Sequence, residues 1–242
     1  MSSALEIALF PCLADNYGLL IHDKDSGQTA AIDTPEVKAI EAACEQRGWT
    51  LTQIWNTHHH WDHVGGNLEL KAAHGLTITG PSQEERIPGL DRGVAGGNRF
   101  SFGAHEVQVI FTPGHTRDHI IYYVPAAKAA FVGDTLFVLG CGRLFEGSAK
   151  DMFGSMAAIA ALPGETKLYC AHEYTLSNAK FALTVEPDNE ALSQYVERAK
   201  ALREKGLPTV PTTVEMEKQT NPFMRAKTAA RLGQIRQAKD SF

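Results

Sequence analysis

The sequence predicts an α/β protein with a helical C-terminal part. Short runs rich in β-branched and aromatic residues alternate with a few helical stretches up to about residue 172. From about residue 176 onward, the pattern becomes mainly helical. The 242 residues are 43% hydrophobic and 21% charged, which is typical of a globular chain and too apolar for a disordered one. The length suits one large domain, or a medium domain with a smaller appendage.

Strands are expected where short apolar runs end at glycine, proline or polar turn residues. In chain order, the expected strands are Leu5–Phe10, Gly18–His22, Thr29–Ile32, Thr52–Trp55, Thr77–Thr79, Glu106–Phe111, Ile120–Val124, Ala129–Val132 and Lys167–Cys170.

Capping signals mark the expected helices. Thr34 can cap a helix that has Pro35 at its first position, and Gly48 ends that helix. Asn221-Pro222 likewise opens a last helix that runs nearly to the C-terminus. The remaining expected elements are a helix over Ala149–Leu162, a helix over Asp188–Lys205 and a loop over Pro208–Gln219.

Composition and charge argue against several classes of function. A net charge of −5 disfavours a general nucleic-acid binder, which needs a clustered basic surface. No apolar run reaches the ~18 residues that a membrane span needs. No basic segment followed by an apolar one marks a signal peptide at the N-terminus. The four cysteines lack CxxC spacing and suggest buried thiols in a reducing compartment. We therefore expect a cytoplasmic monomer without nucleic-acid or membrane partners.

The segment Thr57–Gly66 indicates a metal site. It places four histidines and one aspartate within six positions, and histidine is the commonest metal ligand among side chains. His58 and His60 are two residues apart on an extended segment, so they point the same way and can bind one metal. Asp62 and His63, beyond a bend, can reach a second metal.

Two other interpretations of this segment are weaker. A solvated histidine-rich loop or tag would lack the interleaved Trp61 and Asp62, and a tag would lie at a terminus. A helical zinc-protease site needs His-Glu-x-x-His. His59 and His63 have that spacing, but His60 stands beside His59 where the glutamate should be.

Three further polar residues each follow an expected strand: His115, Asp134 and His172. Taken alone, each would more often be a structural histidine or a turn residue. Because α/β scaffolds assemble their sites from loops at strand ends, we expect these residues to join the first cluster.

Five histidines and two aspartates are enough for two adjacent divalent cations. Nitrogen and oxygen donors without thiolate suit Zn, Fe or Mn. A metal lowers the pKa of bound water toward ~7, so hydroxide is available at neutral pH and hydrolysis is the expected chemistry. One metal would be held by His58, His60 and His115, and the other by Asp62, His63 and His172. The carboxylate of Asp134 would bridge the two metals.

This set of residues resembles the motif of the metallo-β-lactamase superfamily, whose fold is an αββα sandwich. A finer resemblance, to the hydroxyacylglutathione hydrolase (glyoxalase II) family, covers essentially the whole chain. It implies a catalytic domain over residues 1–172 and a helical substrate-binding domain over residues 173–242. The segments that carry the finer resemblance are Asp15–Tyr17, Gly133–Phe137, Gly140–Gly147, Ala171–Thr175, Asn221–Arg225 and Arg236–Phe242.

The family resemblance also implies an activity. The substrate would be S-D-lactoylglutathione, split by water into D-lactate and glutathione in the second step of methylglyoxal detoxification. Two divalent metals, expected to be Zn, would hold the attacking hydroxide. Asp134 and Asp62 would be the catalytic carboxylates.

By the same resemblance, Arg143 and Tyr174 bind glutathione near the site, and Arg236 and Lys239 bind it from the last helix. Residues three apart lie on one helix face, so this pair can form a cationic clamp for the carboxylates of glutathione. A solvated basic helix end is the alternative. Some family members have Lys and Tyr where this chain has Arg143 and Phe145, and phenylalanine cannot donate a hydroxyl hydrogen bond.

Three rival functions remain at this point. A glutathione-persulfide dioxygenase with one iron would generally lack a long helical C-terminal part. A lactonase or lactamase should not need the pair Arg236 and Lys239, and a non-catalytic scaffold has no reason to keep all seven ligands. Of the residues outside the ligand set, His119 is a candidate positioning residue because it follows His115 by four, and Cys141 is expected to be a small buried residue.

Overall fold

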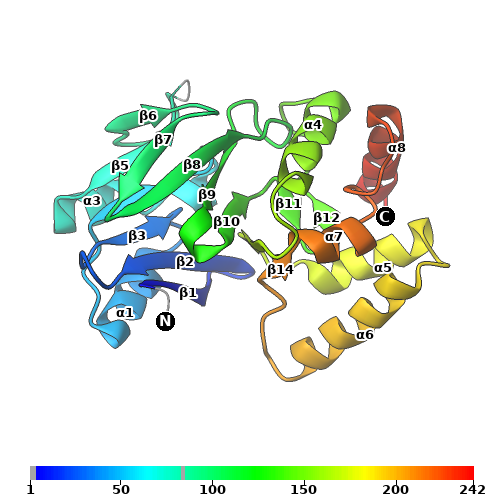
Figure 1. The fold of residues 1–242 in the computed structure, drawn as a ribbon, viewed down its shortest axis with the longest axis horizontal. Coiled ribbons are helices and arrows are strands. Elements are labelled where there is room, and N and C mark those ends of the chain that lie inside the picture. The colour runs from blue at the N-terminus through cyan, green and yellow to red at the C-terminus, as the bar shows by residue number, and fades with distance from the viewer. Residues whose placement is uncertain (1–3, 83–84) are drawn as a thin grey trace. The chain divides into compact units, whose positions relative to one another are not determined.

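The computed structural model describes residues 4–82 and 85–242, which form two compact units (Figure 1). The N-terminal unit is the chain up to Phe111 together with Ile120–Phe131. The C-terminal unit consists of Thr112–His119 and Val132–Phe242. The segment Thr112–His119, which belongs to the C-terminal unit, includes the predicted metal ligand His115.

Two layers of strands build the N-terminal unit. The first is a sheet of order β1-β2-β3-β4-β5-β6, antiparallel from β1 to β3 and parallel from β3 to β6. The second layer is the antiparallel series β7-β8-β9-β10, and the end of β10 enters the C-terminal unit. The strands are β1 (Leu5–Cys12), β2 (Asn16–Asp23), β3 (Thr29–Ile32), β4 (Gln53–Trp55), β5 (Thr77–Pro81), β6 (Arg92–Val94), β7 (Arg99–Phe102), β8 (His105–Phe111), β9 (Ile120–Val124) and β10 (Ala129–Gly133).

Helices α1 (Val37–Arg47) and α3 (Asn67–His74) cover the first sheet, where α1 contacts β1 and α3 contacts β5. Every residue of β3 is buried, as expected for a strand covered on both faces. The core between sheet and helices includes Leu20, Ile40, Ile54, Leu70 and Ile78.

Trp55, at the end of β4, packs between the two layers of strands. Its ring is fully buried and meets Phe100 and Phe102 edge-on, with centroids 5.3 and 5.2 Å away. The hydroxyl of Tyr122 on β9 donates to the carbonyl of Asn56 at 2.8 Å. These contacts fix the point at which the histidine-rich segment leaves the sheet.

Helices dominate the C-terminal unit, with α4 packed on α8 and α5 packed on α6 (Figure 1). Of its short strands, β11 pairs with β12 and β13 pairs with β14. Across the described residues, we find no helix with the length and apolar character needed to cross a membrane. The elements are β11 (Leu136–Phe137), β12 (Gly140–Cys141), α4 (Ala149–Ala160), β13 (Lys167–Cys170), α5 (Thr175–Val185), α6 (Glu190–Glu204), β14 (Thr212–Thr213), α7 (Val214–Thr220) and α8 (Ala229–Asp240).

The expected strands are all present, each with ends within two residues of the prediction. The expected start of the first helix is wrong, because α1 begins at Val37 and Glu36 precedes it. The hydroxyl of Thr34 does not cap this helix. It donates instead to Asn67 Oδ1 at 2.7 Å, tying two loops together.

The expectations for residues 208–242 also need correction. The segment predicted as a loop contains β14 and α7, and Thr213 caps α7 by accepting from the Met216 N–H. Asn221 ends α7 instead of opening the last helix. The last helix, α8, starts after Thr228, whose hydroxyl accepts from the Arg231 N–H. Local spacing could not separate these two helices because both have polar capping residues and similar composition.

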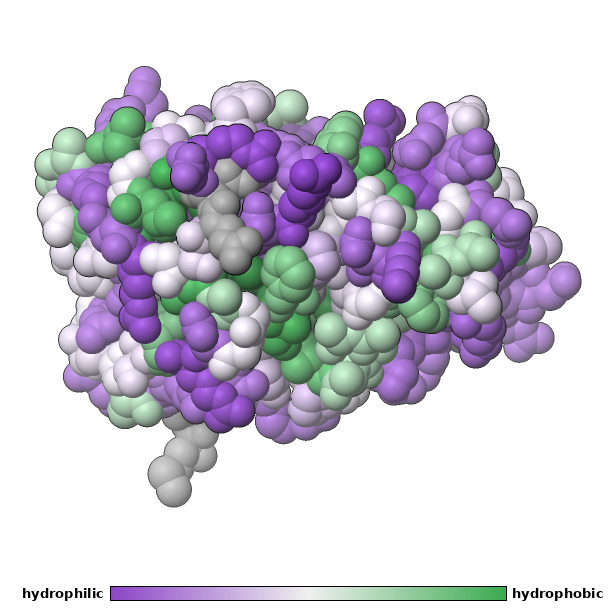
Figure 2. Space-filling view, turned by 90° about the horizontal axis from the view of Figure 1, so that it is seen from above, coloured by the Kyte–Doolittle hydropathy of each residue, from purple (hydrophilic) through white to green (hydrophobic). Residues whose placement is uncertain are grey.

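On the face drawn in Figure 2, hydrophilic residues cover much of the surface and apolar residues lie between them. Exposed apolar residues are common on the surfaces of folded chains.

Candidate metal centre

A histidine-rich turn follows β4 in the N-terminal unit. It leads into the four-residue helix α2 (Trp61–Val64), whose N-cap residue is His60 in extended conformation. His58 Nε2 and His60 Nδ1 lie 3.1 Å apart, so the two nitrogens can share either one proton or one cation. Their approach agrees with the predicted pairing of residues two apart on an extended segment.

Asp62 and His63 lie on α2. Asp62 Oδ2 accepts a hydrogen bond from the side-chain amide of Asn16 at 3.0 Å and is 3.5 Å from His63 Nε2. The His63 side chain is buried, whereas about a quarter of the Asp62 side chain is exposed. The bend predicted before this pair is the start of α2.

Asp33, which sequence reasoning missed, orients this cluster. Its Oδ2 is 2.9 Å from His63 Nδ1, and its carboxylate accepts from both the backbone N–H and the hydroxyl of Thr57 at 2.8 Å. Thr57 Oγ1 is in turn 3.0 Å from His58 Nδ1. One ligand atom from each of Asp33, His58 and His63 lies within 4.8 Å of the others. The signal in the sequence was the position of Asp33 directly after β3, the parallel neighbour of β4.

His115, Asp134 and His172 come together in the C-terminal unit. Asp134 Oδ2 is 3.4 Å from His115 Nε2, and Asp134 Oδ1 is 3.5 Å from His172 Nε2. All three side chains are almost fully buried. Each oxygen of one carboxylate thus faces a different imidazole, which is the geometry that a bridging carboxylate needs.

The backbone around these three residues is closely packed. His115 Nδ1 is 2.9 Å from the carbonyl oxygen of Arg143. A Cβ atom at Gly142 would lie 2.1 Å from the Asp134 carbonyl oxygen, so only glycine fits there. The Asp134 N–H donates to His119 Nε2 at 3.2 Å. His119 is therefore placed as the sequence suggested, holding the backbone of a predicted ligand.

Aromatic rings surround the same group. His172 and Tyr174 stack with centroids 4.8 Å apart and planes 7° apart, and Phe137 meets both rings edge-on. Phe145 packs edge-on against His115 at 5.3 Å while 63% of its surface stays exposed. An apolar ring therefore stands beside a predicted ligand.

The predicted cationic residues lie near this group but differ in exposure. Arg236 is only 5% exposed, and it donates to the Cys141 carbonyl and to the Asp240 carboxylate, each at 2.9 Å. Arg143 is mostly exposed, 3.8 Å from the same Asp240 oxygen. Partial burial, and then the charges of Arg236 and Arg143, lower the pKa of Lys239. Because these cations disfavour one another, a bound anion would stabilise them.

The thiols take no part in this chemistry. Burial raises the pKa of Cys141 and Cys44 to about 11 and that of Cys12 and Cys170 to about 12. They stay protonated at neutral pH and are poor ligands and poor nucleophiles. Cys141 is a small buried residue, as expected.

The donor set fits divalent cations. It consists of buried imidazole nitrogens and carboxylate oxygens, the ligands that Zn, Fe and Mn accept. The Nδ1 atoms of His58, His63 and His115 face Thr57, Asp33 and the Arg143 carbonyl, respectively. Metal-binding histidines characteristically engage their second ring nitrogen in this way.

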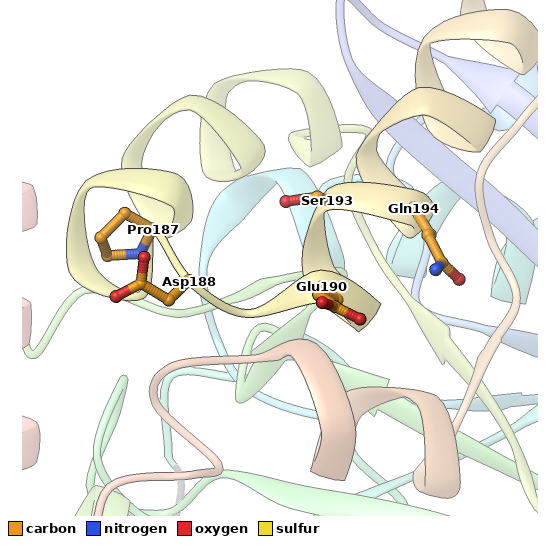
Figure 3. Close-up of a pocket in the computed structure, with 5 residues that line it drawn as sticks. All are labelled: Pro187, Asp188, Glu190, Ser193 and Gln194. Carbon is orange, nitrogen blue, oxygen red and sulfur yellow. The ribbon is translucent and has the colours of Figure 1, made fainter.

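A surface pocket of about 450 Å³ lies apart from these residues, at the start of α6 (Figure 3). The close-up shows Asp188 and Glu190 among the residues that line it. Two carboxylates with no cation among the lining residues make it unsuited to an anionic ligand, so it does not compete as the functional site. The lining residues are Pro187, Asp188, Glu190, Ser193 and Gln194.

Comparison with known proteins links both parts of the chain to described families. Residues 32–172 match the model of the metallo-beta-lactamase superfamily, and residues 173–242 match the model named hydroxyacylglutathione hydrolase C-terminus. The chain is 51% identical over 255 residues to a protein named hydroxyacylglutathione hydrolase from Maricaulis maris, covering 99% of this chain and 100% of the relative. It is 52% identical over 257 residues to a protein of the same name from Brucella ovis, covering all of both.

Among solved structures, the chain is similar to ETHE1 from Myxococcus xanthus, with a TM-score of 0.74 and 25% identity. The match covers 96% of this chain and 90% of the other. It is also similar to the B3 metallo-beta-lactamase BLEG-1, with a TM-score of 0.68 and 18% identity, covering 91% of this chain and all of the other. These structures share its fold.

Proposed function

The chain belongs to the hydroxyacylglutathione hydrolase family of the metallo-beta-lactamase superfamily, and from this membership we propose how its residues cleave a thioester. The predicted αββα fold class with a helical C-terminal part is confirmed. The protein is a metal-dependent thioester hydrolase. The boundary between residues 172 and 173, expected from the sequence, remains a prediction.

The proposed substrate is S-D-lactoylglutathione, which water splits into D-lactate and glutathione. Full-length relatives that carry the name hydroxyacylglutathione hydrolase support this assignment. They also favour hydrolysis over the dioxygenase and lactonase alternatives that the sequence left open.

The protein uses divalent metal ions, and we propose two, expected to be Zn. When bound, the metals supply an ionised water at neutral pH and polarise the thioester carbonyl. Imidazoles oriented by Asp33, Thr57 and the Arg143 carbonyl support this assignment. The proposed ligands are His58, His60 and His115 for one metal, Asp62, His63 and His172 for the other, and Asp134 for both.

The protein groups each have a defined task in this proposal. Asp134 presents one oxygen toward His115 and the other toward His172, so its carboxylate would hold both metals. Asp62, whose Oδ2 accepts from the Asn16 amide, would hold one metal and so help to position the water that the metal ionises. The leaving group, the glutathione thiolate, is a weak base because its thiol has a pKa near that of cysteine, about 8.5, so the C–S bond can break without a general acid.

Glutathione would bind along the cationic side of the C-terminal unit. Arg143 and Lys239 offer exposed or half-exposed charges, and Tyr174 lies against His172. Arg236, the other proposed glutathione ligand, is buried and donates to the Cys141 carbonyl and the Asp240 carboxylate, so its positive charge would act on the glutathione carboxylate beside that of Lys239. The lowered pKa of Lys239 supports an anion site, since crowded cations bind carboxylates more strongly.

We further propose a cytoplasmic monomer. The four cysteines are free and buried, as in proteins of reducing compartments.

The observation that carries the proposal is the seven-ligand set, split between two compact clusters of imidazoles and carboxylates. Its test measures hydrolysis of S-D-lactoylglutathione beside S-lactoyl-cysteamine, with metal content determined on the same sample. We expect about two metals per chain and a strong preference for the glutathione thioester. Equal rates on both thioesters would refute glutathione recognition, and no hydrolysis by a metal-loaded sample would refute the hydrolase. Oxygen consumption with glutathione persulfide would then support the dioxygenase.

A further inference from the structure

Two polar residues, Glu217 within α7 and Asn221 at its C-cap, are fully buried and have no task in the proposed reaction. Glu217 and Asn221 lie one helical turn apart, and both are 0% exposed. A buried carboxylate is costly unless donors surround it. Here Thr212 Oγ1 donates to Glu217 Oε1 at 2.7 Å, and Asn221 Nδ2 donates to Glu217 Oε2 at 2.9 Å.

Asn221 Oδ1 accepts a local hydrogen bond from the Phe223 N–H at 2.9 Å, and three further hydrogen bonds of this pair go to the β11–β12 hairpin. The Leu139 N–H, in the turn of the hairpin, donates to Glu217 Oε2 at 3.0 Å. Leu139 has a φ of 60°, which a residue with a side chain rarely adopts. Asn221 Nδ2 also donates to the carbonyl of Gly140 at 2.9 Å and to that of Phe137 at 3.3 Å. The pair thus binds the turn and both strands of the hairpin.

This hairpin lies close in the chain to the predicted ligand Asp134 and to the group that faces His115. It starts two residues after Asp134 and ends at Cys141, and the Gly142 N–H donates to the Thr135 carbonyl at 3.3 Å. The next residue is Arg143, whose carbonyl faces His115 Nδ1.

The hairpin also reaches the third ligand. The Phe137 ring packs edge-on against His172 with centroids 5.7 Å apart. A shift of the hairpin would therefore displace the groups that orient all three ligands of the unit.

We propose that Glu217 and Asn221 are positioning residues, which hold the β11–β12 hairpin so that His115, Asp134 and His172 keep the geometry needed to bind metal. The inference rests on the proposed function for the identity of the ligands. It extends that function by making α7, more than 40 residues beyond the last ligand in the sequence, part of the support of the metal centre.

The test compares two substitutions at Glu217 with one on the same helix. Glu217→Met keeps the length of the side chain but accepts no hydrogen bond. Glu217→Gln can still accept from Leu139 and Asn221 through its oxygen, while its amide donates to the Thr212 hydroxyl. Glu215→Met makes the same change at an exposed residue of α7. Among the described residues, the Glu215 side chain accepts a hydrogen bond only from the Gln219 side chain, at 2.8 Å.

Zn²⁺ affinity is measured by competition with a chromophoric chelator, and backbone hydrogen exchange is followed over residues 136–143. Glu217→Met should weaken Zn²⁺ binding by about tenfold or more and speed exchange in the hairpin, because outer partners of metal ligands typically matter by 10–100-fold. Glu217→Gln and Glu215→Met should stay within about twofold of the parent protein. If Glu217→Met does not fold, Asn221→Ala, which keeps the Leu139 contact, replaces it with the same expected loss.

The outcomes separate this inference from the proposed function. Normal Zn²⁺ affinity in folded Glu217→Met would overturn the inference while leaving the hydrolase intact. Equal losses in Glu217→Met and Glu215→Met would also overturn it, since the effect would then belong to α7 as a whole. A parent protein that binds no Zn²⁺ and cleaves no thioester would overturn both.

Discussion

Replacing Asp33 by asparagine gives a sharp test of how the N-terminal cluster is oriented. The backbone should tolerate the change, because Asp33 has a φ of 60° and asparagine adopts this conformation readily. The oxygen of the new side-chain amide can still accept from the Thr57 N–H, and the Thr57 hydroxyl can accept from the amide nitrogen. The altered contact is the one with His63 Nδ1 at 2.9 Å.

The size of the effect follows from that single contact. An amide N–H facing His63 Nδ1 favours the imidazole tautomer with its proton on Nε2, the nitrogen that must bind metal. One hydrogen bond to a charged group contributes about 1.5–3 kcal/mol. This range corresponds to a loss of about 10–100-fold in metal affinity, which is typical for such outer partners.

The assay is Zn²⁺ competition with a chromophoric chelator at neutral pH, combined with thermal unfolding of the metal-free protein. Asp25→Asn, at an exposed aspartate in the same unit, serves as the matched control. Zn²⁺ affinity of Asp33→Asn within twofold of the control, in a folded protein, would refute the role given to Asp33.

Three further predictions follow from the C-terminal unit. Lys239→Ala should raise KM for S-D-lactoylglutathione about tenfold at nearly constant kcat, because this cation lies away from the reacting bond; a fall in kcat alone would contradict its role as a glutathione ligand. Gly142→Ala should lower the unfolding temperature and weaken metal binding, because the new Cβ would lie 2.1 Å from the Asp134 carbonyl; Gly154→Ala, inside α4 with nothing within 4 Å, should leave metal binding unchanged and raise the unfolding temperature slightly, because alanine favours a helix more than glycine does. Burial raises the pKa of Glu217 from 4.5 to about 7, so the folded state retains a proton that the unfolded chain releases, and the contribution of this group to stability is fully present below pH 4.5 and is lost as pH rises through about 7. Glu217→Gln should remove this pH-dependent contribution to the free energy of unfolding, which is of order 3 kcal/mol. Urea unfolding should therefore show a smaller loss of stability between pH 5 and pH 7.5 in the variant than in the parent.

The strands and the ligand-bearing loops were predictable because their signals are local. Runs such as Ile120–Val124 and Lys167–Cys170 are strands in the structure with the predicted bounds. His115, Asp134 and His172 each follow such a run, and they do lie together in the C-terminal unit. Short apolar runs with β-branched residues, bounded by turn residues, leave few alternatives to a strand.

Prediction failed where a polar side chain had several possible partners. Thr34 and Asn221 both read as helix starts, yet Thr34 binds Asn67 and Asn221 binds the β11–β12 hairpin. The Thr34 hydroxyl makes a distant contact in place of a helix cap, whereas Asn221 keeps a local bond from the Phe223 N–H and adds the distant ones through its amide nitrogen.

By itself, the sequence determined the family, the fold class and the identity of the candidate ligands, because these depend on residue types at fixed spacings. Only the tertiary structure placed the groups that orient them. Asp33 lies about 30 residues before His63, and Glu217 lies more than 40 residues after His172. No rule of sequence spacing connects such positions with the ligands that they support. Hydrogen bonds between loops and helices far apart in the chain form only when packing brings their atoms within about 3 Å, so they had to be seen in the folded molecule.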